Sequence, residues 1–209
     1  MKKIKITKSA LECSLLFGLL CAIFLSFANF DAACSEIKEN VLRLHIVANS
    51  DSETDQNLKF KVRDAILSES DDLFEKESDL EVAIEKAESN LPKLKSIAQK
   101  TIKKEGFDYD CEVKIGTAYF NTRVYDDFTL PAGEYRSLII NIGESKGKNW
   151  WCVIFPQVCI PAATKSDLSD SVSANGVEIA KNSQKYIMRF KTVEIYEDIK
   201  QLFKRGKPS

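Results

Sequence analysis

Apolar and polar residues alternate along several short segments of the chain, and this period of two is typical of strands with one buried face. The segments are 41–48, 109–116, 119–125 and 135–142, followed by a last one that carries Tyr186, Met188 and Phe190. In the first segment, leucines and isoleucine alternate with Arg43 and His45. The short connections between the middle segments predict antiparallel neighbours.

A second pattern, with apolar residues three and four positions apart, predicts helices. One helix follows Ser50 and Glu53, which have the spacing of a capping box, and Asp55 precedes Lys59 by one turn, which predicts an ion pair. The pattern that begins at the capping box of residues 78–81 is longer and ends at Gly106. Pro92 interrupts it, which predicts a kink or a restart capped by Asn90.

The order of these elements predicts an α+β fold. We expect a mostly antiparallel sheet, packed with two N-terminal helices, the longer one containing Pro92, and a C-terminal helix over Val193 to Phe203. Residues 162–184 are rich in Ser, Asn and Asp and predict a long mobile loop. Residues 34–205 are predicted to form a single exported domain, followed by a short tail over 206–209.

The N-terminus has the pattern of an export signal. Four lysines precede an apolar run from Cys13 to Ala28, and residues 26–28 offer a cleavage site of the small-x-small type. Residues 1–33 are therefore interpreted as a signal peptide, with a retained membrane anchor and lipid attachment at Cys34 as alternatives. Because the lysines remain on the cytoplasmic side, the rest of the chain crosses the membrane, and only this segment is expected to contact lipid.

The cysteines outside the signal suggest one disulfide, because an exported protein reaches an oxidising compartment. Cys152 and Cys159 are the nearest pair, and two buried free thiols are the alternative interpretation. The chain has no C-x-x-C motif and its single histidine is His45, so we expect no metal and no cofactor.

Composition and motifs exclude several classes of protein. The formal net charge is −1 and the basic residues form no central face, which disfavours nucleic-acid binding. A single histidine limits hydrolytic chemistry to a Cys or Ser paired with His45, and no nucleophile motif accompanies it. We therefore expect no catalytic residues and no enzyme, with a Cys/His hydrolase as a minor alternative.

Adjacent tryptophans, Trp150 and Trp151, are the most distinctive feature of the remaining sequence. On a strand, neighbouring side chains point to opposite faces, so one ring faces outward unless another element covers it. An outward tryptophan is typical of recognition sites. A protein ligand and a module that stacks these rings on cell-wall glycans both remain open.

Three segments together resemble a known family. They are LRLHIVANSDSETDQNLKFKVRD over residues 42–64, PAGEYR over 131–136 and NWWCVIFP over 149–156. This combination is similar to stage II sporulation protein R of spore-forming Firmicutes. The resemblance implies an intercellular signalling protein, made in the forespore and exported into the space between its two membranes. There it would activate a membrane-embedded aspartic protease that cleaves the precursor of sigma factor E, and it would not be the protease itself.

This reading leads to a hypothesis for the partner-binding surface. The polar residues that follow the first strand and the aromatic residues of the NWWCVIFP segment are predicted to lie near each other and to contact the protease, because recognition residues tend to lie at strand ends and loops. The residues of this surface are Asn49, Ser50, Asp51, Asp55, Trp150, Trp151 and Phe155. For Asn49, Ser50 and Asp51, a helix cap is the alternative role.

Overall fold

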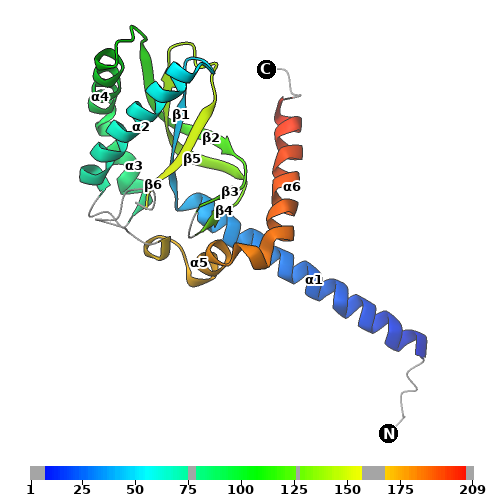
Figure 1. The fold of residues 1–209 in the computed structure, drawn as a ribbon. Coiled ribbons are helices and arrows are strands. Elements are labelled where there is room, and N and C mark those ends of the chain that lie inside the picture. The colour runs from blue at the N-terminus through cyan, green and yellow to red at the C-terminus, as the bar shows by residue number, and fades with distance from the viewer. Residues whose placement is uncertain (1–7, 75–78, 126–127, 157–167, 206–209) are drawn as a thin grey trace.

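The computed structural model of the chain describes residues 8–74, 79–125, 128–156 and 168–205, and Figure 1 shows a long N-terminal helix that projects from a helix-covered sheet. The helices are α1 (Lys8–Glu39), α2 (Glu53–Phe74), α3 (Leu80–Ser89), α4 (Leu91–Lys104), α5 (Ala174–Lys181) and α6 (Ile187–Arg205). The strands are β1 (Leu42–Val47), β2 (Cys111–Phe120), β3 (Arg123–Val124), β4 (Thr129–Leu130), β5 (Gly133–Ile142) and β6 (Asn149–Phe155). Two 3-10 turns, Leu168–Asp170 and Ser183–Tyr186, flank α5.

Four of the strands form one sheet in the order β2-β5-β1-β6. The pairs β2–β5 and β1–β6 are antiparallel, and β1–β5 is parallel. A separate short hairpin is formed by β3 and β4. The predicted α+β class is confirmed, and the sheet is mostly antiparallel as expected, with one parallel pair at its centre.

Helices α2, α3 and α4 cover one face of the sheet, as Figure 1 shows. The side chains that alternate inward from β1 and β5, among them Leu44 and Ile140, are fully buried there against Val62 of α2 and Leu94 of α4. Burial of each such side chain contributes about 1.5–3 kcal/mol relative to leaving it exposed. This cluster is the main core, and it fixes the position of α2 next to β6.

The other face of the sheet carries a second cluster, in which the hairpin β3–β4, α5 and the end of α1 take part. Its members include Phe120, Tyr135 and Ile37. The charged residue Arg43 is fully buried among them: its guanidinium carbon lies 3.9 Å from the ring centroid of Phe120 and 4.8 Å from that of Tyr135. Its Nη2 donates to the hydroxyl of Tyr125 at 2.6 Å. Aromatic faces therefore surround this cation inside the fold.

The last third of α1 belongs to the folded domain. Phe30, Ala33 and Cys34 are buried in a third cluster with α5 and α6. Between Leu11 and Glu39 the helix is long and apolar enough to cross a membrane, and its most apolar stretch is exposed on all sides. One continuous helix thus joins an apolar segment of membrane-spanning length to the core, and the predicted boundary between residues 33 and 34 falls inside its packed part.

The predicted C-terminal strand is wrong. Tyr186 ends a 3-10 turn and residues 187–205 form α6. In this helical conformation Tyr186 and Phe190 lie one turn apart and both contact Phe30, with centroid distances of 5.7 and 5.2 Å, while Met188 points to solvent. The alternation that suggested a strand therefore has another origin: Tyr186 and Phe190 lie on the inner side of a helical segment, and Met188 lies on its outer side.

Two further predictions are corrected. Residues 168–181, which fall in the predicted loop 162–184, form a 3-10 turn and α5, whose start is capped by the hydroxyl of Ser173. Residues 162–167 lie outside the described part of the chain. The predicted strand 119–125 is divided: its first two residues end β2, and Arg123 and Val124 form β3.

Helices α2 and α4 start close to the positions that the sequence predicted, but the predicted residues do not cap them. Pro92 lies in the first turn of α4, which confirms a restart at this point. Asn90 occupies the N-cap position, yet its amide donates to the carbonyl of Lys86 and makes no side-chain cap. The predicted cap Ser50 is displaced by two residues, because Ser52 Oγ accepts the backbone N–H of Asp55 at 3.2 Å at the start of α2.

Candidate docking surface beside the β1–α2 turn

The turn between β1 and α2 and the first turn of α2 hold four of the predicted partner-binding residues, and three of them are joined by hydrogen bonds. Asp55 is 3% exposed, and its Oδ2 accepts hydrogen bonds from Asn49 Nδ2 at 2.9 Å and Ser50 Oγ at 2.6 Å. Burial acts to raise the pKa of Asp55, but the hydrogen bonds from Ser50, Asn49 and Tyr109 outweigh it and hold the pKa below its ordinary value. We call Asn49, Ser50, Asp51 and Asp55 the turn cluster.

The turn cluster also fastens the loop between β5 and β6. Asn49 Oδ1 accepts the backbone N–H of Glu144 at 2.9 Å, and Asp51 Oδ1 accepts that of Lys148 at 2.6 Å. Gly147 donates its N–H to the carbonyl of Ala48. Two connections far apart in the sequence are thereby joined, just before the first tryptophan.

Glycine is required at two positions of this loop. Gly143 has φ +55, and a Cβ there would lie 2.3 Å from Asn49 Oδ1. A Cβ at Gly147 would lie 2.2 Å from the backbone oxygen of Ser50. The loop approaches the turn cluster so closely that no side chain fits between them.

Lys59 of α2 also binds the loop between β5 and β6. It is 2% exposed, and its ammonium donates to Gln56 Oε1 at 2.6 Å and to the carbonyl of Lys148 at 2.9 Å. Burial lowers its pKa, against the attraction of Asp51. The predicted ion pair with Asp55 is wrong, since the two side chains do not pair and Asp55 is occupied by the turn.

Trp150 lies on the face of β6 that α2 covers. Its ring meets Phe60 edge to face at 5.3 Å, and the guanidinium carbon of Arg63 lies 4.7 Å from the Trp150 ring and 5.0 Å from that of Phe60. All three side chains are only partly buried. We call Trp150, Phe60 and Arg63 the aromatic–arginine patch; tryptophan and arginine are the residue types that contribute most to protein interfaces.

Trp151 lies on the opposite face, because neighbouring strand residues alternate. It stacks on His45 at 6.3 Å, and the guanidinium carbon of Arg123 lies 3.8 Å from its ring. Phe155 is 2% exposed in the main core, so the structure gives it a packing role and no exposed contact. The two tryptophans therefore form no common platform, and each is partly covered.

The histidine and the strand cysteines that a Cys/His hydrolase would need lie on opposite faces of the sheet. His45 is on the side of Trp151, and burial lowers its pKa. Cys111 and Cys152 belong to the main core on the other side of the sheet, so neither makes a pair with this histidine. Cys159 lies outside the described residues, so the disulfide with Cys152 has no support from the structure and stays a prediction.

Among residues 8–74, 79–125, 128–156 and 168–205, no group of three His, Cys, Asp or Glu side chains is arranged to hold a metal ion. The sequence reasoning missed Phe60 and Arg63; the signal available was their spacing of three on α2, opposite the predicted apolar stripe of that helix.

Comparison with known proteins agrees with the resemblance in the sequence. The family model for stage II sporulation protein R matches residues 38–165. Stage II sporulation protein R of Bacillus subtilis (strain 168) is 32% identical over 198 residues, which cover 92% of this chain and 84% of the relative. No solved structure matches the chain. The matched region contains the turn cluster and the aromatic–arginine patch, and the chain belongs to the stage II sporulation protein R family.

Proposed function

We propose that this chain is an exported intercellular signal of sporulation. It is made in the forespore, its domain enters the space between the two membranes, and there it activates a membrane-embedded aspartic protease that cleaves the precursor of sigma factor E. The observation that carries the proposal is the family match over residues 38–165, which covers the domain from β1 to β6.

The N-terminal helix supports the export step. α1 presents an apolar stretch that is exposed on all sides, and α1 continues directly into the domain. A helix of this kind directs the chain across the membrane, either as a cleaved signal or as an anchor. In both cases the domain acts on the far side.

The aromatic–arginine patch is our candidate for the contact with the protease. Its rings already meet edge to face and the guanidinium lies over the Trp150 ring, so little side-chain freedom remains to be lost on binding. The turn cluster, by contrast, uses its polar atoms within the fold. We therefore propose that the turn cluster positions the patch, and that the patch makes the contact.

Reconstitution tests the function itself. The candidate protease and the sigma-factor precursor are produced in a non-sporulating host, with and without this chain, and the size of the precursor is followed. Cleavage only in the presence of the exported chain is expected. Absence of cleavage, with all three proteins folded and correctly located, would contradict the proposal and favour the wall-binding alternative, which a pull-down on peptidoglycan would then examine.

A charge reversal tests the patch. Arg63→Glu is expected to abolish cleavage in the same host, because it removes the cation stacked on Trp150 and presents an anion to the partner. Lys100→Glu, at an exposed position of α4, makes the same charge change away from the patch and is the matched control. Equal cleavage with both variants would remove the patch from the proposal while leaving the signalling function intact.

A further inference from the structure

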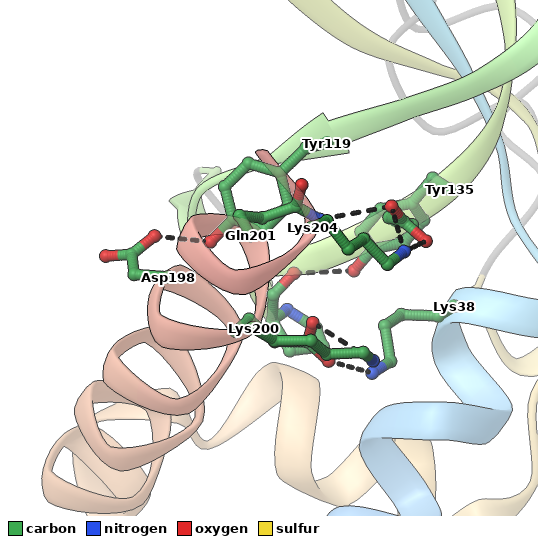
Figure 2. A network of polar contacts seen from close by, with 10 residues as sticks. Lys38, Tyr119, Tyr135, Asp198, Lys200, Gln201 and Lys204 are labelled. Carbon is green, nitrogen blue, oxygen red and sulfur yellow. Dashed lines mark hydrogen bonds and ion pairs between the residues drawn. The ribbon is translucent and has the colours of Figure 1, made fainter. Parts of the chain in front are cut away.

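The second half of helix α6 packs on the rest of the domain through polar side chains. Figure 2 shows this network between α6, the end of α1 and the strands β2 and β5. Its contacts are Lys38 with Glu197 (3.4 Å), Lys200 with Glu197 (3.4 Å), Tyr119 with Asp198 (2.6 Å), Gln201 with Glu134 (3.1 Å) and Lys204 with Glu134 (2.7 Å). Glu197 is 4% exposed at the centre of the network. The side of α6 that faces the protein is thus largely ionic over its second half.

The opposite side of α6 is apolar and exposed. Six residues make up this side, which we call the outer stripe: Met188, Ile195, Tyr196, Ile199, Leu202 and Phe203, all between 48% and 79% exposed. At 3.6 residues per turn they fall within one arc of the helix. A helix on the surface of a water-soluble domain normally has the reverse arrangement, with the apolar side inward. The outer stripe therefore fits an apolar environment better than water.

The start of α6 is attached to α1 where α1 leaves the domain. Arg189 Nη2 donates to Ser26 Oγ at 2.8 Å, and its guanidinium carbon lies 5.9 Å from the rings of Phe27 and Phe30. Phe190 packs on Phe30 at 5.2 Å. On the N-terminal side of Ser26, α1 presents exposed leucines and phenylalanines all round. Figure 1 shows the start of α6 beside α1. A membrane crossed by α1 would thus begin next to the first turns of α6.

We propose that the outer stripe of α6 lies in the interfacial layer of the membrane that α1 enters. Tyr196, Ile199 and Phe203 line a shallow depression together with Lys200 and Lys204. Lysines at the border of an apolar stripe can lay their stems along it and keep their ammonium groups in polar surroundings, and here those groups pair with Glu197 and Glu134. A lipid surface supplies the apolar layer that the outer stripe lacks, and it is already present at the adjoining end of α1.

This placement gives the domain a second membrane contact, in addition to the N-terminal segment that the sequence indicated. It orients the domain, because α1 and α6 approach the membrane from two points of the same fold. The polar network then has a defined role, which is to hold the sheet on the water side of α6.

Fluorescence quenching tests the proposal on the full chain in vesicles of phosphatidylglycerol and phosphatidylethanolamine. Ile199→Trp places a reporter in the outer stripe, and Glu105→Trp places one at the exposed end of α4, on the other side of the sheet, as the control. The emission of the unsubstituted chain, which contains Trp150 and Trp151, is subtracted. For Ile199→Trp we expect a shift to shorter wavelength and a loss of intensity when lipids with brominated acyl chains replace ordinary ones, with neither change for Glu105→Trp.

Two results would overturn the proposal. Emission of the Ile199→Trp reporter at the wavelength of an exposed indole, without quenching, would show that the stripe remains in water. A shift to shorter wavelength without quenching by brominated lipid would show that protein covers the stripe, which in purified vesicles means a second copy of this chain. Folding of each variant is checked by the circular dichroism of the full chain.

Discussion

Replacing Asp55 by Asn is the most direct test of the turn cluster. The change preserves the size of the side chain but replaces Oδ1 or Oδ2 by an NH₂ group among donors, since Asn49 Nδ2 and Ser50 Oγ both donate to Oδ2. Hydrogen bonds to a charged group contribute about 1.5–3 kcal/mol each, and the amide oxygen can retain only the weaker, neutral form of them. We expect the free energy of unfolding to fall by about 2–4 kcal/mol.

The same substitution should change the dependence of stability on pH. The folded state holds the pKa of Asp55 below its unfolded value, which is about 3.9, so the carboxylate stabilises the fold fully above that value. This contribution is lost as the pH falls through the lower pKa of the folded state. The Asp55→Asn variant lacks the group, and its stability should therefore fall less between pH 5 and pH 2 than that of the unsubstituted chain.

Urea unfolding of the full chain in detergent, followed by the fluorescence of Trp150 and Trp151, measures both effects. Asp108→Asn, which changes an exposed carboxyl on the same domain, is the control and should alter stability by less than about 0.5 kcal/mol. A loss below about 1 kcal/mol for Asp55→Asn, with an unchanged dependence on pH, would refute the reasoning. It would mean that the turn is held by the backbone contacts of Gly147 and not by the buried carboxylate.

Three other substitutions address the remaining contacts. Gly147→Ala is expected to cost about 1–3 kcal/mol of unfolding free energy, because its Cβ would meet a backbone oxygen at 2.2 Å, whereas Gly116→Ala meets only the movable end of an isoleucine at 3.3 Å and should be tolerated better. Phe30→Ala should cost about 3–5 kcal/mol in thermal or urea unfolding if the end of α1 belongs to the core, and a surface-like effect would contradict that assignment. Glu134→Gln should speed hydrogen exchange in α6, because it removes the ion pair with Lys204. In the unsubstituted chain this ion pair should also be lost as the pH falls below the lowered pKa of Glu134. Equal exchange rates in α6 for the variant and the unsubstituted chain would count against the network.

The elements with a clear local signal could be predicted from the sequence. The sequences of β1 and β5 alternate as strands do, although β1 is buried on both faces and not on one; α2 begins close to its capping residues, and Pro92 divides the long helical pattern where the chain restarts. The parallel pairing of β1 with β5 had no such signal, because it depends on the intervening helices returning the chain to the centre of the sheet. Sequence patterns describe single elements, and pairing between distant elements is decided by packing.

The candidate site shows the same limit at the level of side chains. The sequence places both the Asn49–Asp55 turn and Trp150 at the ends of strands, and the strands that carry them, β1 and β6, pair with each other. The role of the turn could not be predicted, since Asn49 and Asp51 bind backbone N–H groups of a loop almost one hundred positions away in the chain. Arg63 was missed for a related reason: an arginine on the polar side of a helix is ordinary until a neighbouring strand places Trp150 beneath it.

The buried end of α1 bears on how the domain is released or retained. Cleavage after Ala28 would remove Ser26 and Phe27, and with them two contacts of Arg189, but it would leave Phe30 in its cluster with Phe190. The folded domain is therefore compatible with both a cleaved signal and a retained anchor. What differs is the number of membrane contacts, because a released domain would reach the lipid surface through the outer stripe of α6 alone. On our proposals, the distance of the aromatic–arginine patch from a membrane-embedded protease would then depend on α6, which gives this helix a part in signalling even though it lies outside the segment matched by the family model.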